Sequence, residues 1–164
     1  MSIPSLLTYG GFLHDPGYAG GIVDELNVDI MNLINNGASA IDYGIAIARD
    51  ASGQCRLIAA DADKILGISV RFPIKAAPGY GQANANVVQY QQYDEVPVLR
   101  HGNIYVLAYE NVTQDDQALS ITAQGGKIGG VTGGAAGAGR VVIPDAIWQT
   151  TTAAGSIGIV RITS

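Results

Sequence analysis

The stretch from residue 43 to residue 72, YGIAIARDASGQCRLIAADADKILGISVRF, decides the fold class. It contains three short apolar runs, YGIAIAR, CRLIA and KILGISVRF, which polar or glycine-containing segments separate. The apolar residues of the first run alternate, so Ile45 and Ile47 fall on one face of an extended chain. Residues 61–63 (DAD) are typical of a turn before the last run. The pattern predicts consecutive β-strands.

The same pattern continues toward the C-terminus. Strands are expected in VVQYQQ, EVPVLR, NIYVLAY, ALSITA, KIGGV, RVVI, AIWQTT and SIGIVRIT. Residues 101–103 (HGN) are expected to form a hairpin turn between EVPVLR and NIYVLAY. Short strands with turn signals every ~8–12 residues are typical of barrels and sandwiches. We therefore expect an all-β fold, a small β-barrel or jelly-roll-like sandwich, with little helix.

The first 25 residues differ from the rest, because Gly and Pro interrupt their apolar residues every few positions. This favours an extended N-terminal arm over residues 1–25, followed by one domain over residues 26–164. The arm is too apolar for a solvated tail, so we expect it to cover its own domain or a partner. Residues 26–36 fit either a helix or a strand. Residues 125–139 are rich in glycine and predict a wide, exposed and flexible β-loop.

Composition and charge exclude several classes of protein. The chain has 164 residues, of which only 14% are charged, and its net charge is −5. Residues 1–48 contain no Lys or Arg, so a secretory signal peptide is not expected. No clustered basic residues could neutralise nucleic-acid phosphates, and no apolar run is long enough to span a membrane. We expect an acidic, soluble protein made in the cytoplasm, with neither nucleic acid nor membrane as a partner.

The residues that usually carry catalysis are sparse. His14 and His101 are the only histidines, which excludes a three-histidine zinc site, and the glycine-rich segment matches no phosphate-binding motif. Cys55 is expected to be a buried, unreactive thiol. Three pairs of carboxylates fall at predicted turns, where acids are usually solvated; they are Asp61 with Asp63, Asp94 with Glu95, and Asp115 with Asp116. We expect no catalytic site, no cofactor and no metal.

Two long segments resemble a known family. Residues 55–74 (CRLIAADADKILGISVRFPI) and residues 90–113 (YQQYDEVPVLRHGNIYVLAYENVT) resemble the structural cement, or capsid decoration, proteins of tailed bacteriophages. PDAIWQT at residues 144–150 is similar to the C-terminal pattern of that family, and the resemblance spans roughly residues 17–162. Residues 125–140 depart from the pattern.

The resemblance implies a virion protein that binds the outer surface of the mature capsid. Its partners would be the major capsid protein and further copies of itself, as a dimer or trimer. Candidate capsid or subunit contacts are the apolar arm residues, the acidic residues beside them and four aromatic residues of the domain: Leu6, Leu7, Tyr9, Phe12, Leu13, Asp15, Asp24, Glu25, Tyr90, Tyr93, Tyr105 and Trp148.

Two other functions fit the residues. Short strands, eight tyrosines and glycine-rich loops also suit a receptor- or carbohydrate-binding β-module of a phage fibre or adhesin. A small hydrolase that uses the turn carboxylates is the second alternative.

Overall fold

The computed structural model describes residues 18–24, 27–71, 89–122 and 128–163, and every regular element within them is a β-strand. This confirms the expected all-β fold. The strands are β1 (Asp29–Ile34), β2 (Ile41–Asp42), β3 (Ala46–Arg49), β4 (Cys55–Leu57), β5 (Ile65–Ser69), β6 (Gln89–Tyr90), β7 (Glu95–Leu107), β8 (Gln117–Ile121), β9 (Val131–Thr132), β10 (Arg140–Trp148) and β11 (Ile157–Thr163).

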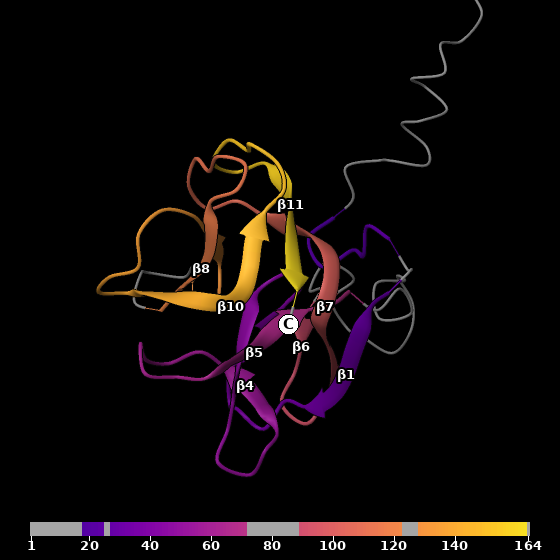
Figure 1. Ribbon diagram of the computed structural model, residues 1–164. Coiled ribbons are helices and arrows are strands. Elements are labelled where there is room, and N and C mark those ends of the chain that lie inside the picture. Colours follow the sequence, from indigo (N-terminus) through magenta and orange to yellow (C-terminus); the bar gives the residue numbers. More distant parts are fainter. Residues whose placement is uncertain (1–17, 25–26, 72–88, 123–127, 164) are drawn as a thin grey trace, which may run out of the picture.

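One curled antiparallel sheet contains most of these strands. Its order is β4-β3-β5-β7-β11-β10-β8-β9, β1 also pairs with β7, and β2 and β6 form a separate pair. Figure 1 shows β7 curving between β11 and β1. Leu99 of β7 pairs with Ile30 of β1 on one side and with Ile68 of β5 on the other. Because His101 pairs with both β1 and β11, β5 and β11 share the edge of β7 that lies opposite β1.

The central strands β3, β5 and β7 separate two hydrophobic cores. Along β3, Ile47 faces one core, whereas Ala46 and Ala48 face the other. This explains why β3, β5 and the first half of β7 are mainly apolar, since both of their faces are covered. The larger core includes Ile68, Leu99, Ile104, Val106, Ala118, Val131, Trp148 and Val160. The smaller core consists of Ile41, Tyr43, Ile45, Ile47, Cys55, Tyr90, Val96 and Val98.

The expected hairpin turn at residues 101–103 was wrong. These residues lie inside β7, a continuous strand of 13 residues. Gly102 has a φ of 127°, which lets the strand bend there, and a Cβ on Gly102 would lie 2.9 Å from Cγ1 of Val28. A glycine that bends a strand and a glycine that ends one look alike in sequence.

Two further expectations change in the C-terminal half. RVVI and AIWQTT are not separate strands, because β10 runs from Arg140 to Trp148, and its pairing with β8 is irregular between Val142 and Ile147. The glycine-rich segment is only partly an exposed loop. Val131 and Thr132 are buried and form β9, which pairs with β8, whereas residues 134–138 are exposed. Residues 123–127 lie outside the described residues.

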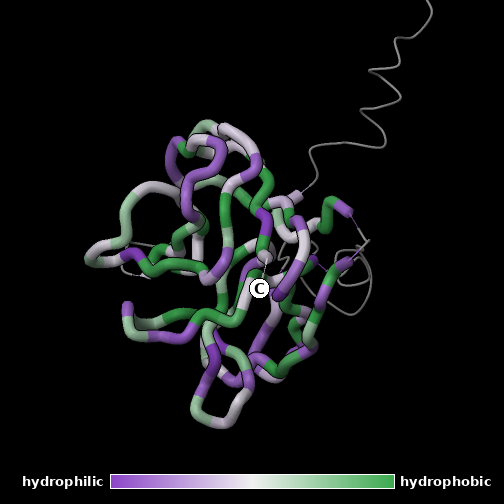
Figure 2. Tube along the Cα trace, viewed as in Figure 1, coloured by the Kyte–Doolittle hydropathy of each residue, from purple (hydrophilic) through white to green (hydrophobic). Residues whose placement is uncertain are grey.

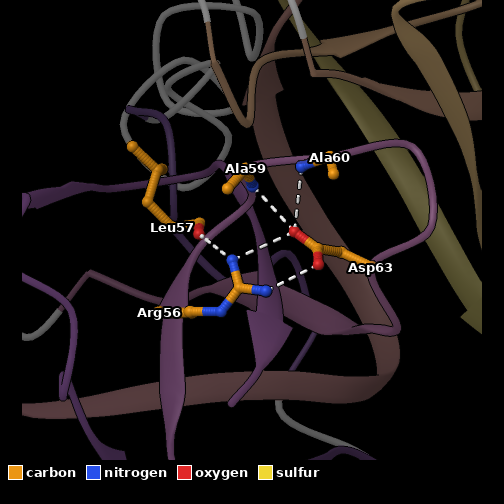
Figure 3. A network of polar contacts seen from close by, with 5 residues as sticks. All are labelled: Arg56, Leu57, Ala59, Ala60 and Asp63. Atoms are coloured by element: carbon orange, nitrogen blue, oxygen red, sulfur yellow. Dashed lines mark hydrogen bonds and ion pairs between the residues drawn. The ribbon is translucent and has the colours of Figure 1, made fainter.

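A carboxylate network holds the turn between β4 and β5 (Figure 3). Asp63 accepts hydrogen bonds from the Arg56 guanidinium at 2.6 and 3.0 Å and from the main-chain N–H groups of Ala59 and Ala60 at 2.7 and 3.1 Å. The hydrogen bonds from Arg56 are the main cause that lowers the pKa of Asp63 below its ordinary value. Asp61 bonds instead to the Thr122 hydroxyl and to the N–H of Gly139, so the turn also fixes the end of the glycine-rich segment.

We predict that Gly67→Ala destabilises the protein. A Cβ on Gly67 would overlap with the main-chain carbonyl oxygen of Leu99 and lie 3.0 Å from Cγ1 of Val98, so β5 and β7 would have to separate. The expected loss in the free energy of unfolding is about 2–3 kcal/mol, measured by chemical denaturation. Gly137→Ala is the matched control, because nothing lies within 4 Å of the added Cβ. Equal stability of the two variants would contradict this account of the packing.

We also predict a pH-dependent contribution from Asp63. Because its pKa is lower in the folded chain, the stabilisation is complete above the unfolded-state pKa of about 4 and is lost as the pH falls toward the folded-state value. Asp63→Asn should therefore cost about 1–3 kcal/mol at pH 7, and the difference from the unmodified chain should shrink below about pH 4. Denaturation curves from pH 2.5 to pH 7 measure this. The exposed Glu95→Gln is the control for net charge, and a difference that is independent of pH would refute the assignment.

Candidate functional site

The outer edge of β1 offers main-chain groups to a partner. The N–H of Asn35 donates to the carbonyl oxygen of Asp94, and the Asn35 carbonyl accepts from the N–H of Tyr93, so these groups point to the side of β1 on which β7 lies. The N–H of Ile34 points away from β7 and donates to Oε1 of Gln54 at 2.9 Å. Since successive residues of a strand alternate, Ile30 and Asn32 also point outward. Within the described part of the chain, no group hydrogen-bonds to the outward N–H and C=O groups of Ile30 and Asn32. We call this strip, residues 30–34, the β1 edge.

Exposed apolar side chains accompany the β1 edge. Ile30 and Ile34 are 38% and 37% exposed, and Asn32 between them is exposed. Figure 2 shows apolar and polar segments mixed along this strand. The edge carries neither Lys nor Pro, the residues with which proteins commonly protect an edge strand. The β1 edge is therefore chemically suited to pair with an uncharged strand.

Tyr93 lies at the end of the same strip. Its N–H donates to the carbonyl oxygen of Asn35 at 2.7 Å, one residue beyond the end of β1. Its side chain is 70% exposed, and its φ of 69° is a left-handed conformation that is unfavourable for a tyrosine. The turn is held by Asp94, whose carboxylate accepts from the N–H of Gln91 at 2.8 Å. An exposed aromatic residue on a strained, ordered turn is a candidate contact residue.

The base of the N-terminal arm is fixed to the domain. The guanidinium of Arg71 lies 3.8 Å from the centre of the Tyr18 ring and 5.9 Å from that of Tyr43. Gly20 donates to the carbonyl oxygen of Tyr105, and its carbonyl accepts from Arg71, each at 2.8 Å. Gly20 and Gly44 are in such close contact that a Cβ on Gly44 would lie 2.7 Å from the nitrogen of Gly20. The arm therefore leaves the domain from a defined point.

The structure separates the proposed contact residues into three groups. Leu6, Leu7, Tyr9, Phe12, Leu13, Asp15 and Glu25 lie outside the described residues. Asp24 and Tyr93 are exposed, and Tyr105 is half-buried.

Tyr90 and Trp148 are completely buried, so the structure places them in the core rather than at an interface. The Tyr90 hydroxyl donates to the carbonyl oxygen of Val70 at 2.5 Å, and the Trp148 indole N–H donates to that of Thr132 at 2.9 Å. Both polar atoms are satisfied inside the chain, which lets these large side chains be buried.

The sequence analysis did not identify the β1 edge. Its alternating pattern, Ile30, Asn32 and Ile34 on one face and Met31 and Leu33 on the other, was present but also fitted a helix. Deciding that a strand is an edge strand requires the topology, which local sequence does not contain.

The described residues do not bring catalytic groups together. Cys55 is buried, as expected, and its burial raises the pKa of the thiol to about 11, which disfavours the reactive thiolate. The carboxylates of Asp63, Asp94 and Asp116 accept hydrogen bonds from main-chain N–H groups of their own turns. The Asp61 carboxylate accepts from Thr122 and Gly139. Within the described ranges no three His, Cys, Asp or Glu residues form a group that could hold a metal, and no helix is long and apolar enough to cross a membrane.

A cavity of about 230 Å³ lies where β5 and β11 meet β7. It is lined mainly by apolar residues, including Ile65, Ile143 and Ile162, together with Arg49 and Arg100. Arg100 also lies 3.7 Å from the carboxylate of Asp29. The lining contains no acid, histidine or cysteine, so this cavity has no general acid, general base or nucleophile of the usual kinds.

Comparisons with known proteins agree with the fold. A chain of the solved structure entitled "The capsid of Myoviridae Phage XM1" superposes with a TM-score of 0.69 and 18% sequence identity, and the match covers 90% of this chain and 91% of that chain. At this identity the likeness establishes the fold. No curated protein matches the sequence.

The family comparison covers almost the whole chain. The family described as "Structural cement protein (E217 gp24/Pam3 gp6)" matches residues 7–163. This range includes both segments on which the sequence resemblance rests, as well as β1 and Tyr93. The chain therefore belongs to the phage structural cement protein family.

Proposed function

We propose that this protein binds the outer surface of the mature phage capsid as a homo-oligomer and stabilises the contacts between neighbouring major capsid proteins. The observation that carries the proposal is the family match over residues 7–163. The fold likeness to a chain of a phage capsid structure supports it. The protein would be made in the host cytoplasm and then join the virion.

The proposed mechanism is passive. A protein that binds only the mature arrangement of the shell stabilises that arrangement by mass action. An interface of ~1,600 Å² is enough for specific binding, and an oligomer gains further affinity from simultaneous contacts. No chemical step is required, which suits a chain whose turn carboxylates are used to hold turns.

The proposed contacts lie in two regions. The first is the N-terminal arm, whose apolar residues (Leu6, Leu7, Tyr9, Phe12 and Leu13) would lie along the shell or a sister subunit and add a strand to an exposed edge. Its acidic neighbours, Asp15, Asp24 and Glu25, would complement basic capsid patches. The second region is the domain surface around Tyr93, with Tyr105 beside the base of the arm.

Co-sedimentation with purified mature shells tests the function. The protein should pellet with the shells at a fixed number of copies per shell and should raise the temperature at which they disrupt. A chain that stays in the supernatant and leaves shell stability unchanged would refute the proposal. Binding to a glycan array without binding to shells would favour the carbohydrate-binding alternative.

Tyr93→Ala should weaken binding to shells by about tenfold or more, because an exposed tyrosine at an interface centre is a typical hot spot. Tyr93→Phe, which keeps the ring, should retain most of the affinity. Val142→Ala is the positional control, since Val142 is 39% exposed on β10. If Tyr93→Ala and Val142→Ala behave alike, Tyr93 is not a contact residue.

Binding should also depend on ionic strength. The chain carries a net charge of −5, and its first 48 residues contain acids without cations. Attraction to basic patches should raise the association rate at low salt, where screening is weak. Surface plasmon resonance on immobilised shells at ~0.05 M and ~0.5 M salt should show a several-fold slower association at high salt. Asp24→Asn should reduce this dependence, and a rate unaffected by salt would exclude the electrostatic part of the mechanism.

A further inference from the structure

The cavity of about 230 Å³ lies at the place where β5 and β11 leave the same edge of β7. β5 pairs with Val98 and Leu99 of that strand, and β11 pairs with it from His101 onward, so Arg100 stands at the division. β10 contacts β5 across the same place. The walls of the cavity are therefore strands from both halves of the sheet, and strands hold a binding site more precisely than loops do.

The size of the cavity suits a single side chain. A cavity of about 150 Å³ is enough for a benzene molecule, whereas sites for drug-sized ligands measure about 300–1,000 Å³. The aliphatic part of the lining comes from β5 and β11 and from β10, and consists of Ile65, Leu66, Ile143, Pro144 and Ile162. Such a surface favours a short aliphatic group, which loses its contact with water there.

The charged part of the lining has one sign. Arg49 and Arg100 line the cavity, and none of the described lining residues is an acid. The whole chain contains 14 acids and nine bases, so the charge of the cavity is opposite to the net charge of the chain. A carboxylate is well matched to guanidinium groups, because its two oxygens accept parallel hydrogen bonds from the planar donor.

Other arginines of the described chain are used to hold the fold. Their partners lie close to them: Arg56 is 2.6 Å from Asp63, Arg140 is 2.6 Å from Glu110, and Arg71 is 3.8 Å from the centre of the Tyr18 ring. The arginines of the cavity differ from these three.

Arg49 is exposed, and among the described residues none forms an ion pair or a side-chain hydrogen bond with it. Arg100 lies 3.7 Å from the carboxylate of Asp29, and these two side chains are 43% and 56% exposed. An exposed ion pair at this distance contributes little to stability. A carboxylate that enters the cavity would therefore meet one arginine without an ion-pair partner in the described chain and a second whose pair with Asp29 is weak.

We propose that this cavity binds an acidic segment of a neighbouring protein of the shell, in which an Asp or Glu carboxylate lies beside an aliphatic side chain. The aliphatic group packs against Ile65, Ile143 and Ile162, and the carboxylate binds to Arg49 and Arg100. The inference rests on the proposed function, which supplies the partner. A basic cavity on an acidic chain gives the shell two contacts of opposite charge, and together they favour one orientation of binding.

Titration of the free protein with 4-methylpentanoate tests the site, because this probe joins a carboxylate to an aliphatic group. Methyl NMR should show shifts at Ile65, Ile143 and Ile162, with a Kd of roughly 1–10 mM, as suits a ligand of few atoms. 4-Methylpentanamide, which has a similar shape without the charge, should bind about fivefold more weakly or less. Equal binding of the acid and the amide, or no shifts at these methyl groups, would overturn the proposal.

Variants of the two arginines test their role. Arg49→Gln and Arg100→Gln should each weaken the binding of 4-methylpentanoate several-fold, and Arg100→Lys should keep part of the affinity. Arg161→Gln is the matched control, because it removes the same charge beside Ile162. Arg161 is exposed, and successive residues of a strand point to opposite faces, so its side chain lies on the face away from the cavity. An equal loss in the Arg161 variant would refute a specific site.

Purified mature shells test the identity of the partner. The double variant Arg49→Gln with Arg100→Gln should bind shells about tenfold more weakly in co-sedimentation, whereas Arg161→Gln should bind like the unmodified chain. Unchanged binding of the double variant would overturn the assignment of a shell protein as the partner. The titration uses no shells, so a chain that fails to bind shells refutes the proposed function, and the cavity is still tested by the probe.

Discussion

The main-chain hydrogen bonds of β7 are the constraint on which the rest of the structure depends. One edge of this strand pairs with β5 at Val98 and Leu99 and with β11 from His101 onward, so two groups of strands begin from the same edge. The strands that follow from β5 cover the first half of β7, and those that follow from β11 cover the second half. The two hydrophobic cores lie between these groups of strands and β7. Gly67 lies beside the Leu99 carbonyl at the division, where no larger residue fits.

Local sequence predicted the strands that this arrangement buries, but not the way they join. The runs at residues 43–49 and 64–70 are apolar because both faces of β3 and β5 are covered, so their strand character was visible. Whether Gly102 bends a strand or ends it depends on the neighbours of β7, and those lie far away in sequence. Val131 and Thr132 likewise become a buried strand through pairing with β8, in a segment whose glycines suggested a loop.

The candidate site was predictable only in part for a related reason. Tyr90 and Tyr93 are the same residue type and only three positions apart. Tyr90 is buried, with its hydroxyl bonded to the carbonyl oxygen of Val70, whereas Tyr93 is exposed and has a left-handed backbone conformation. Composition identified aromatic residues as the route to binding, and only the fold could separate core from surface. For the carboxylates, the sequence was more informative, because their positions at turns were already evident. Asp63 holds the turn between β4 and β5, and Asp61 joins that turn to the glycine-rich segment at Gly139.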